Sequence, residues 1–293
     1  MNTFKQRLIH LHACPQVSRS LLNKWLKLDP DLATLLKITP EKISTTFRLP
    51  SENSLVIYKY LHGTSIMKKL DTDEQGYECV TIFDTDYPEL LKTIPDPPLV
   101  LYIKGNKKLL KHPLTLSVVG TRTPSNYALP AMRQILIPLI KSNFCMVSGM
   151  AMGIDQCVHR LAIQHGGTTI AVIGSGFDHI YPRNNLALYK HMGDTQLIIS
   201  EYPPDRPPRK YHFPERNRII SGLSEATLVI EARLRSGSLI TVDQALEQGR
   251  EVFAMPGPID SKTSEGCHYM IREGATLLQG YQDIIHAYAE KLK

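Results

Sequence analysis

Apolar residues in the first part of the chain, residues 1–65, recur at helical spacing. Such residues fall every three or four positions between 4 and 11, and Ser18 can cap a second helix that follows it. Leucines at 32, 35 and 36 predict a third helix, and Thr39-Pro40 starts a fourth. No alternating strand pattern interrupts them. We therefore predict a small all-α domain over residues 1–65.

From residue 115 the pattern changes to short apolar runs that alternate with helical stretches. The runs are 115–120, 144–149, 168–176, 196–200, 226–231 and 251–257, and the helical stretches are 127–140, 154–163, 239–248 and 267–273. A polar loop is expected after the third run and a long loop after the fourth. This alternation is typical of an α/β fold with a parallel sheet covered by helices on both faces.

The segment between these two regions, residues 66–114, reads as a connection. It contains one strand candidate, residues 99–103, and prolines at 95, 97 and 98 that favour fixed extended backbone over helix. The predicted organisation is thus a helical domain over 1–65, a connecting segment over 66–114 and an α/β domain over 115–293.

Charge and cysteine content add two weak constraints. The 293 residues carry a formal net charge of +6, which leans slightly toward anionic partners such as nucleic acid. The five cysteines are scattered without CxxC spacing, so we expect reduced thiols in the cytoplasm and no metal site. The N-terminus lacks a signal-peptide core, and no apolar run approaches the ~20 residues of a membrane span.

Two glycine turns follow predicted strands at the sheet edge where ligands of parallel sheets bind. In the first, Gly120 allows a tight turn and Arg122 can grip a phosphate; a plain turn with a solvated arginine is equally compatible with it. In the second, Ser148, Gly149 and Gly153 open a helix and can expose backbone amides to an anion. Asp155 in this loop favours a capping role over a catalytic one.

A basic and aromatic loop, residues 206–218, carries the most informative pattern. It packs five cations and two aromatic residues into thirteen positions, and such mixtures suit single strands because cations follow phosphates while rings stack on bases. Its candidate contacts are Lys210, Phe213, Arg216, Asn217 and Arg218. The alternative is a solvated basic loop whose Phe213 fills the core.

Two further strand ends carry small polar residues. Ser236, Gly237 and Ser238 begin a helix and offer donors to another phosphate. The run Gly174-Ser175-Gly176, followed by Tyr181-Pro182, indicates little beyond a turn. Several anion-friendly turns on one edge favour a ligand with several phosphates, which is a polynucleotide rather than a mononucleotide.

Motifs for chemistry are missing from the chain. The sequence has no HExxH, no GxSxG and no Cys/His ligand cluster, and no pair of carboxylates is placed by a motif for acid–base work. We therefore expect a binding protein rather than an enzyme, with no cofactor and no metal.

At this point the motifs resemble a known family. SVVGTR, SGMAMGID, TIAVIGSGFDHIYPRNN, SEYPPDRPPRKYHFPERNRIISGLS, VIEARLRSGSLIT, EQGREVFAMPG and SEGCHYMIREGA follow one another in the order of the DprA family (DNA-processing protein A), over roughly residues 80–285. The helical N-terminal part resembles, less specifically, the family's sterile-alpha-motif-like domain. The resemblance implies an extended Rossmann fold, single-stranded DNA binding, loading of RecA onto that DNA during natural transformation and recombination, and a homodimer formed through the C-terminal part.

The resemblance also implies roles for individual residues. The family's DNA-binding arginine corresponds to Arg122, its lysine and phenylalanine to Lys210 and Phe213, and its RNR run to residues 216–218. Many members have an arginine where this chain has Met152, and many carry a C-terminal winged helix that we expect to be absent here. Apolar candidates for the dimer surface are Tyr269, Ile271 and Leu277, for which ordinary core packing is the alternative.

Two other functions remain open at the sequence level. Related-looking Rossmann proteins hydrolyse nucleoside monophosphates, but the PGGxGTxxE run of that family has no counterpart here. A scaffold that binds only protein is the third possibility, and the basic aromatic loop argues against it.

Overall fold

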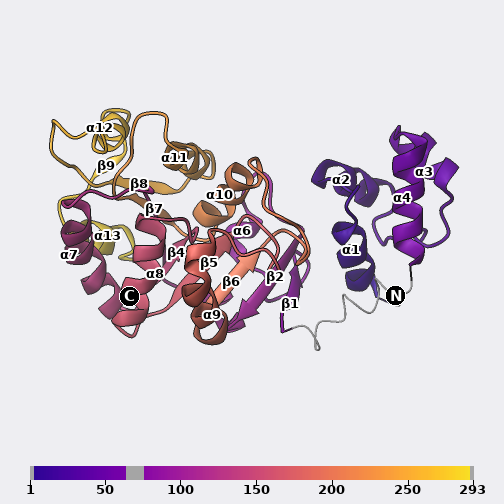
Figure 1. Ribbon diagram of the computed structural model, residues 1–293, viewed down its shortest axis with the longest axis horizontal. Coiled ribbons are helices and arrows are strands. Elements are labelled where there is room, and N and C mark those ends of the chain that lie inside the picture. The colour runs from indigo at the N-terminus through magenta and orange to yellow at the C-terminus, as the bar shows by residue number, and fades with distance from the viewer. Residues whose placement is uncertain (1–2, 64–75, 291–293) are drawn as a thin grey trace. The chain divides into compact units, whose positions relative to one another are not determined.

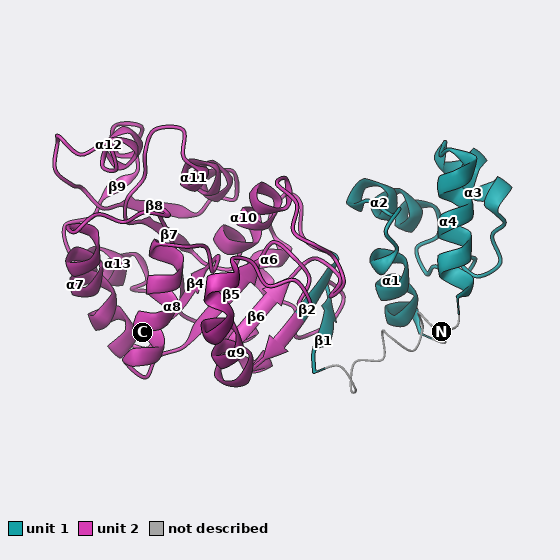
Figure 2. Cartoon of the chain, viewed as in Figure 1, with its two compact units in different colours: residues 1–81, 99–102 teal, residues 82–98, 103–293 magenta. Residues whose placement is uncertain are grey.

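The computed structural model describes residues 3–63 and 76–290 and divides the chain into two compact units. The first unit comprises Met1–Thr81 and Leu99–Tyr102, and the second comprises Ile82–Pro98 and Ile103–Lys293 (Figure 2). The expected connecting segment 66–114 is therefore shared between the units. Residues 66–75 of it lie outside the described residues, and the remainder contains strands and short helices.

The first unit is built from four helices in its N-terminal part. These are α1 (Phe4–Ala13), α2 (Arg19–Leu28), α3 (Pro40–Phe47) and α4 (Ser51–His62). The predicted cap at Ser18 is confirmed, because its side chain accepts a hydrogen bond from the backbone N–H of Leu21. Thr39 caps α3 in the same way.

The prediction of a helix around residues 32–36 is wrong, since residues 30–37 form turns. The Asp29 carboxylate accepts hydrogen bonds from the backbone N–H groups of Ala33 and Thr34, which offers this backbone an alternative to helix. Leu32 adopts a left-handed conformation with φ of 51°. Leu32 and Leu35 are nevertheless fully buried. Their spacing therefore reflects insertion of a turn into the core rather than a helical face.

One nine-stranded sheet runs through the structure in the order β1-β2-β6-β5-β4-β3-β7-β8-β9 (Figure 1). Its strands are β1 (Glu78–Thr81), β2 (Val100–Gly105), β3 (Thr115–Val119), β4 (Cys145–Ser148), β5 (Thr169–Ile173), β6 (Leu197–Ser200), β7 (Ala226–Val229), β8 (Glu251–Ala254) and β9 (Thr276–Leu277). All pairings from β6 to β9 are parallel. The predicted α/β fold is confirmed.

Helices cover both faces of the sheet in the second unit. They are α6 (Glu89–Lys92), α7 (Ala128–Lys141), α8 (Ile154–Gln164), α9 (Leu186–Thr195), α10 (His212–Gly222), α11 (Gly237–Glu247), α12 (Glu265–Arg272) and α13 (Tyr281–Ala287), with 3-10 turns η2 (Lys107–Lys111) and η3 (Arg183–Asn185). Helices α7, α8 and α13 share one apolar core with β3 and β4. Helices α10 and α11 pack together. In β3, Leu116 and Val118 face that apolar core, whereas Ser117 between them points to the other face, where its hydroxyl donates a hydrogen bond to the Ile220 carbonyl of α10.

Burial explains why the strands read as continuous apolar runs. Every residue of β3 and of β5 is buried, as expected for strands covered on two faces. The polar loop expected after β5 is only partly correct, because it contains η3 and α9. Leu188, Tyr189 and Met192 of α9 are buried, and this ten-residue helix was hidden by the polar residues around it. None of the helices in the described ranges is long and apolar enough to cross a membrane.

The strand order places a crevice in the middle of the sheet. From β3 the chain proceeds outward through β4, β5 and β6 on one side, and later returns to β7 on the other side of β3. Such a reversal separates the connections that leave the two central strands, and ligands of open parallel sheets bind in the gap beyond the strand ends.

Candidate nucleic-acid interface

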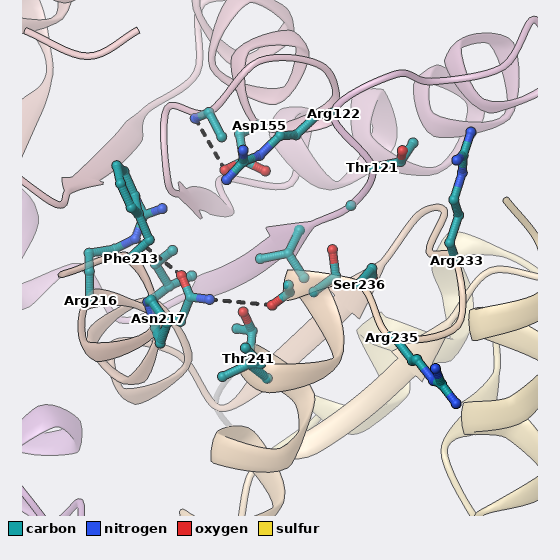
Figure 3. A pocket seen from close by; sticks show the side chains of 18 of the residues that line it. Thr121, Arg122, Asp155, Phe213, Arg216, Asn217, Arg233, Arg235, Ser236 and Thr241 are labelled. Carbon is teal, nitrogen blue, oxygen red and sulfur yellow. Dashed lines mark hydrogen bonds between the residues drawn. The ribbon is translucent and has the colours of Figure 1, made fainter. Parts of the chain in front are cut away.

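A cavity of about 630 Å³ lies at this reversal, beyond the carboxyl ends of β3 and β7 (Figure 3). Three segments form most of its wall. They are the turn after β3, the stretch from Lys210 into α10, and the loop from Arg233 into α11. Candidate residues predicted from the sequence lie in all three segments, and the fold brings them together.

The turn after β3 presents Arg122 to the cavity as an exposed side chain. Gly120 permits α8 to approach this turn, because a Cβ atom at Gly120 would lie 2.7 Å from the Ile154 side chain. Gly153 has a φ of +82°, and its backbone passes close to the carbonyl of Thr121. Both glycines therefore shape the turn that holds Arg122; Gly120 also lines the cavity, whereas Gly153 is buried.

The loop between β4 and α8 differs from the expectation of free backbone amides. The Asp155 carboxylate accepts hydrogen bonds from the N–H groups of Gly149 and Ala151, at 3.2 and 3.3 Å. Ser148 is fully buried, and its hydroxyl donates to the Val118 carbonyl. The loop amides at 149 and 151 are thus occupied inside the protein, and Ser148 has no surface for a ligand.

Asp155 lies at the inner end of the cavity, where burial raises the pKa of its carboxyl group and the Arg216 guanidinium opposes that shift. Its two bonds to loop amides identify it as a structural acceptor, in agreement with the capping role expected from the sequence. Among the described residues, no second carboxylate lines this cavity.

The basic run on α10 is mostly internal. Arg216 is 5% exposed and donates to the carbonyls of Gly149 and Val172. Burial lowers the pKa of Arg216 to about 10, so the guanidinium stays charged at neutral pH. Arg218 is 6% exposed and donates two bonds of 2.7 Å to Glu201. Arg216 still lines the cavity with its buried side chain, whereas Arg218 does not line it.

Three other residues of this segment reach the cavity. Lys210 is exposed, Phe213 is partly buried, and the amide of Asn217 donates to the Gly237 carbonyl at 3.4 Å. The Phe213 ring packs over Gly174, where a Cβ atom would lie 3.2 Å from it. Figure 3 shows Phe213 and Asn217 on the α10 side of the cavity. The ring is thus anchored on one side and faces the cavity.

The start of α11 forms the opposite wall. Ser236, Gly237 and Ser238 line the cavity there, and Ser236 makes no capping hydrogen bond although it occupies the N-cap position. Thr241, one turn further along the helix, lines the same wall. The N–H groups of this first helical turn favour negative charge.

Two exposed cations at the cavity, Arg233 and Arg235, were not among the sequence candidates. They lie in the loop that leads into the Ser-Gly-Ser run. Two arginines just before a predicted helix start are the sequence feature that could have identified them. Figure 3 shows the Arg235 guanidinium pointing away from the middle of the cavity. Arg235 has a left-handed φ of 62°, which fixes this direction of the loop.

The three dimer candidates lie outside the cavity. Tyr269 and Ile271 belong to α12 and Leu277 to β9, the edge strand of the sheet. Tyr269 is 48% and Leu277 41% exposed, so core packing does not account for either side chain.

Comparison with known proteins gives consistent results. A family profile for DNA recombination-mediator protein A matches residues 78–289. The chain is 40% identical to DNA processing protein DprA of Bacillus subtilis over 279 residues, which cover 94% of this chain and 92% of that protein. It is 45% identical to the Streptococcus pneumoniae DprA over 216 residues, covering 74% and 76% of the two chains.

Two solved structures are similar over most of their length. The X-ray structure of DprA from Streptococcus pneumoniae superposes with a TM-score of 0.85 at 36% identity and covers 98% of both chains. A structure of DprA from Helicobacter pylori, described for its single-stranded DNA binding mode, has a TM-score of 0.66 at 29% identity and covers 73% of this chain and 96% of that one.

Proposed function

The chain belongs to the family of DNA recombination-mediator protein A, and on this basis we propose that it binds single-stranded DNA and loads a RecA recombinase onto it during natural transformation and homologous recombination. Recombination mediators of this kind are DNA-binding proteins and not enzymes. The nucleotide-hydrolase alternative is therefore not carried further.

One observation carries the DNA-binding proposal. The cavity at the strand reversal combines exposed cations, Arg122 and Lys210, with the ring of Phe213. Cations follow a phosphate backbone and a ring stacks on a base, and a single strand offers both at once. The similar protein from Helicobacter pylori binds single-stranded DNA, which supports the same assignment here.

The structure narrows the set of proposed contacts. Arg122, Lys210, Phe213, Asn217 and the start of α11 at residues 236–238 face the cavity and stay in the proposal. Gly120 and the buried Arg216 also line it and stay in the proposal. Ser148, Gly149, Gly153 and Arg218 are buried and do not line it, so we assign them to the framework behind the site.

RecA loading and dimer formation are proposals of the same kind. The exposed Tyr269 and Leu277 on α12 and the edge strand β9 support a homodimer through this part of the chain. An edge strand has unpaired backbone groups that a second copy can cover. RecA and incoming single strands both occur in the cytoplasm, where we place the protein.

The test of the DNA site compares three single substitutions by titrating a fluorescent single strand. Lys210→Ala should weaken binding and flatten the dependence of log K on log salt by about 0.7 for a lost phosphate contact. Phe213→Ala should weaken binding by about 1–3 kcal/mol with an unchanged slope, because it removes stacking. Lys141→Ala, at the exposed end of α7, is the control. Parental affinity in both cavity variants would refute the assignment.

A further inference from the structure

Tyr181, in the connection between β5 and α9, exposes half of its side chain beside the proposed DNA site. The side chain is 51% exposed, and its hydroxyl makes no hydrogen bond within the described residues. A tyrosine buries a large apolar ring in most folds and bonds its hydroxyl when it does so. Neither core packing nor hydrogen bonding accounts for this residue.

The Tyr181 ring lies against Phe213. The two ring centroids are 5.5 Å apart, and the ring planes are inclined by 52°. Both side chains line the large cavity that also contains Arg122 and Lys210. Phe213 is held from behind at Gly174, so its contact with Tyr181 also fixes the outer ring.

A small hollow adjoins the two rings. It is also lined by Met152 and Pro182, by the two arginines Arg122 and Arg216, and by Gly149, Ala151 and Gly174, and Met152 is 44% exposed. A thioether is polarizable and contacts aromatic rings favourably. Met152 and Pro182 therefore extend the apolar surface beside the Phe213 ring.

We propose that Tyr181 is a second base-stacking residue of the site, adjacent to Phe213, and that Met152 contacts the same base. The proposal rests on single-stranded DNA binding as proposed above. Inclined rings present their faces in two directions, so they suit two bases of a splayed strand rather than a stacked duplex. Stacking on a ring tolerates any base, because every base has a π-face.

The experiment measures the affinity of Tyr181→Ala and Tyr181→Phe for two oligonucleotides of equal length, one intact and one with abasic sites throughout its centre. We expect Tyr181→Ala to bind the intact strand about 5- to 150-fold more weakly, the range that corresponds to one lost stack. Its salt slope should equal that of the parent, since no phosphate contact is removed. Tyr181→Phe keeps the ring and should bind like the parent.

The abasic strand separates stacking from a structural role. It lacks the bases that a ring could stack on, so Tyr181→Ala and the parent should bind it equally. An equal loss of affinity on both strands would show that Tyr181 only supports the fold of the loop and would overturn the proposal. Parental affinity of Tyr181→Ala for the intact strand would overturn it as well, while leaving DNA binding by Lys210 and Phe213 in place.

A fluorescence measurement provides a second readout. The chain has one tryptophan, Trp25, which is 1% exposed within the first unit. In Tyr181→Trp the added indole should be quenched by the intact strand and not by the abasic one. Absence of quenching despite binding would refute stacking at this position, whereas absence of binding by the parent would refute the proposed function itself.

Discussion

At the scale of single residues, Gly153 determines how the Arg122 turn is held. Its φ of +82° lies where side-chain-bearing residues are strained, and a Cβ atom would lie 2.4 Å from the Thr121 carbonyl oxygen and 2.6 Å from that of Arg122. Both oxygens are backbone atoms, so they cannot swing aside as a side chain would. The position therefore requires glycine for conformation and for space.

Gly153→Ala should lower the free energy of unfolding by more than the ~1–3 kcal/mol that backbone strain costs, because the clash adds to the strain. It should also weaken single-strand binding by displacing Arg122. Urea denaturation and the fluorescent titration measure the two effects.

Gly166→Ala serves as the matched control for this substitution. Gly166 has a similar φ of +70°, yet a Cβ atom there would meet nothing within 4 Å. It should cost only the left-handed strain, about 1–2 kcal/mol, and leave DNA affinity unchanged. Equal destabilisation by both variants would show that the close approach of the Thr121 and Arg122 carbonyls to position 153 does not affect stability.

The cations of the basic run differ in how deeply they are buried, which the sequence does not show. Lys210 is exposed at the cavity, whereas Arg218, eight residues later, donates to Glu201 inside the protein. Both lie in one stretch of alternating charge and aromatic character. The sequence could therefore predict the segment that lines the cavity, but it could not separate the exposed side chains from the buried ones.

At the scale of elements, helix α10 joins the proposed DNA site to the protein interior through its arginines. Arg218 on α10 also lies 3.5 Å from Asp96, which connects the helix to the segment before β2. Removing one partner of a buried ion pair leaves an uncompensated charge. We therefore expect Arg218 to contribute more to the stability of this helix than to DNA contact.

Arg218→Ala should lower the free energy of unfolding by about 3–5 kcal/mol, as expected when the buried Glu201 loses the guanidinium that donates two hydrogen bonds to it. Arg122→Ala, an exposed arginine, should stay within about 0.5 kcal/mol of the parent. Thermal denaturation checks both values. A fully stable Arg218→Ala protein that has lost DNA affinity would return Arg218 to the set of contacts.

His159 on α8 couples three elements through one buried imidazole. Its Nδ1 lies 2.7 Å from the Thr169 hydroxyl of β5, and that hydroxyl donates to the Met146 carbonyl of β4. Nδ1 therefore carries the proton, and Nε2 is buried without a hydrogen-bond partner. Burial, with a smaller contribution from Arg216, lowers the pKa of His159 to about 3.

Because the pKa of an unfolded histidine is about 6.5, the unfolded chain binds one more proton than the folded chain below that pH. Stability should therefore fall as the pH drops from about 6.5 toward 3, with a contribution from His159 of up to about 1.4 kcal/mol per pH unit. His159→Gln should show a shallower slope between pH 7 and 5 in urea denaturation. An unchanged slope would mean that His159 is not neutral in the folded state.

The limits of prediction from sequence are clearest for two elements. The six apolar runs correspond to β3 to β8, since strands buried on both faces leave an unambiguous signal. Helix α9 was not predicted because it is only ten residues long, follows an asparagine and ends at a threonine. The helix expected at 32–36 failed because Asp29 captures the backbone there.

At the scale of the whole molecule, the strand order creates the site. Residues 119–122, 210–217 and 233–241 are far apart in the chain, and the reversal between β3 and β7 brings them around one cavity. Sequence alone predicts that strand ends share an edge of the sheet, but not which ends are neighbours. Tyr181 shows the consequence, because its sequence context indicated only a turn while the fold places its ring on Phe213.

We propose that this cavity binds single-stranded DNA. The most direct test titrates the intact protein with a fluorescent single strand at two salt concentrations, with a duplex of the same sequence as competitor. We expect binding that weakens steeply with salt, by about 0.7 units of log K per unit of log salt for each phosphate contact, and that the duplex competes for poorly. Absence of binding at low salt, or equal competition by the duplex, would contradict the account.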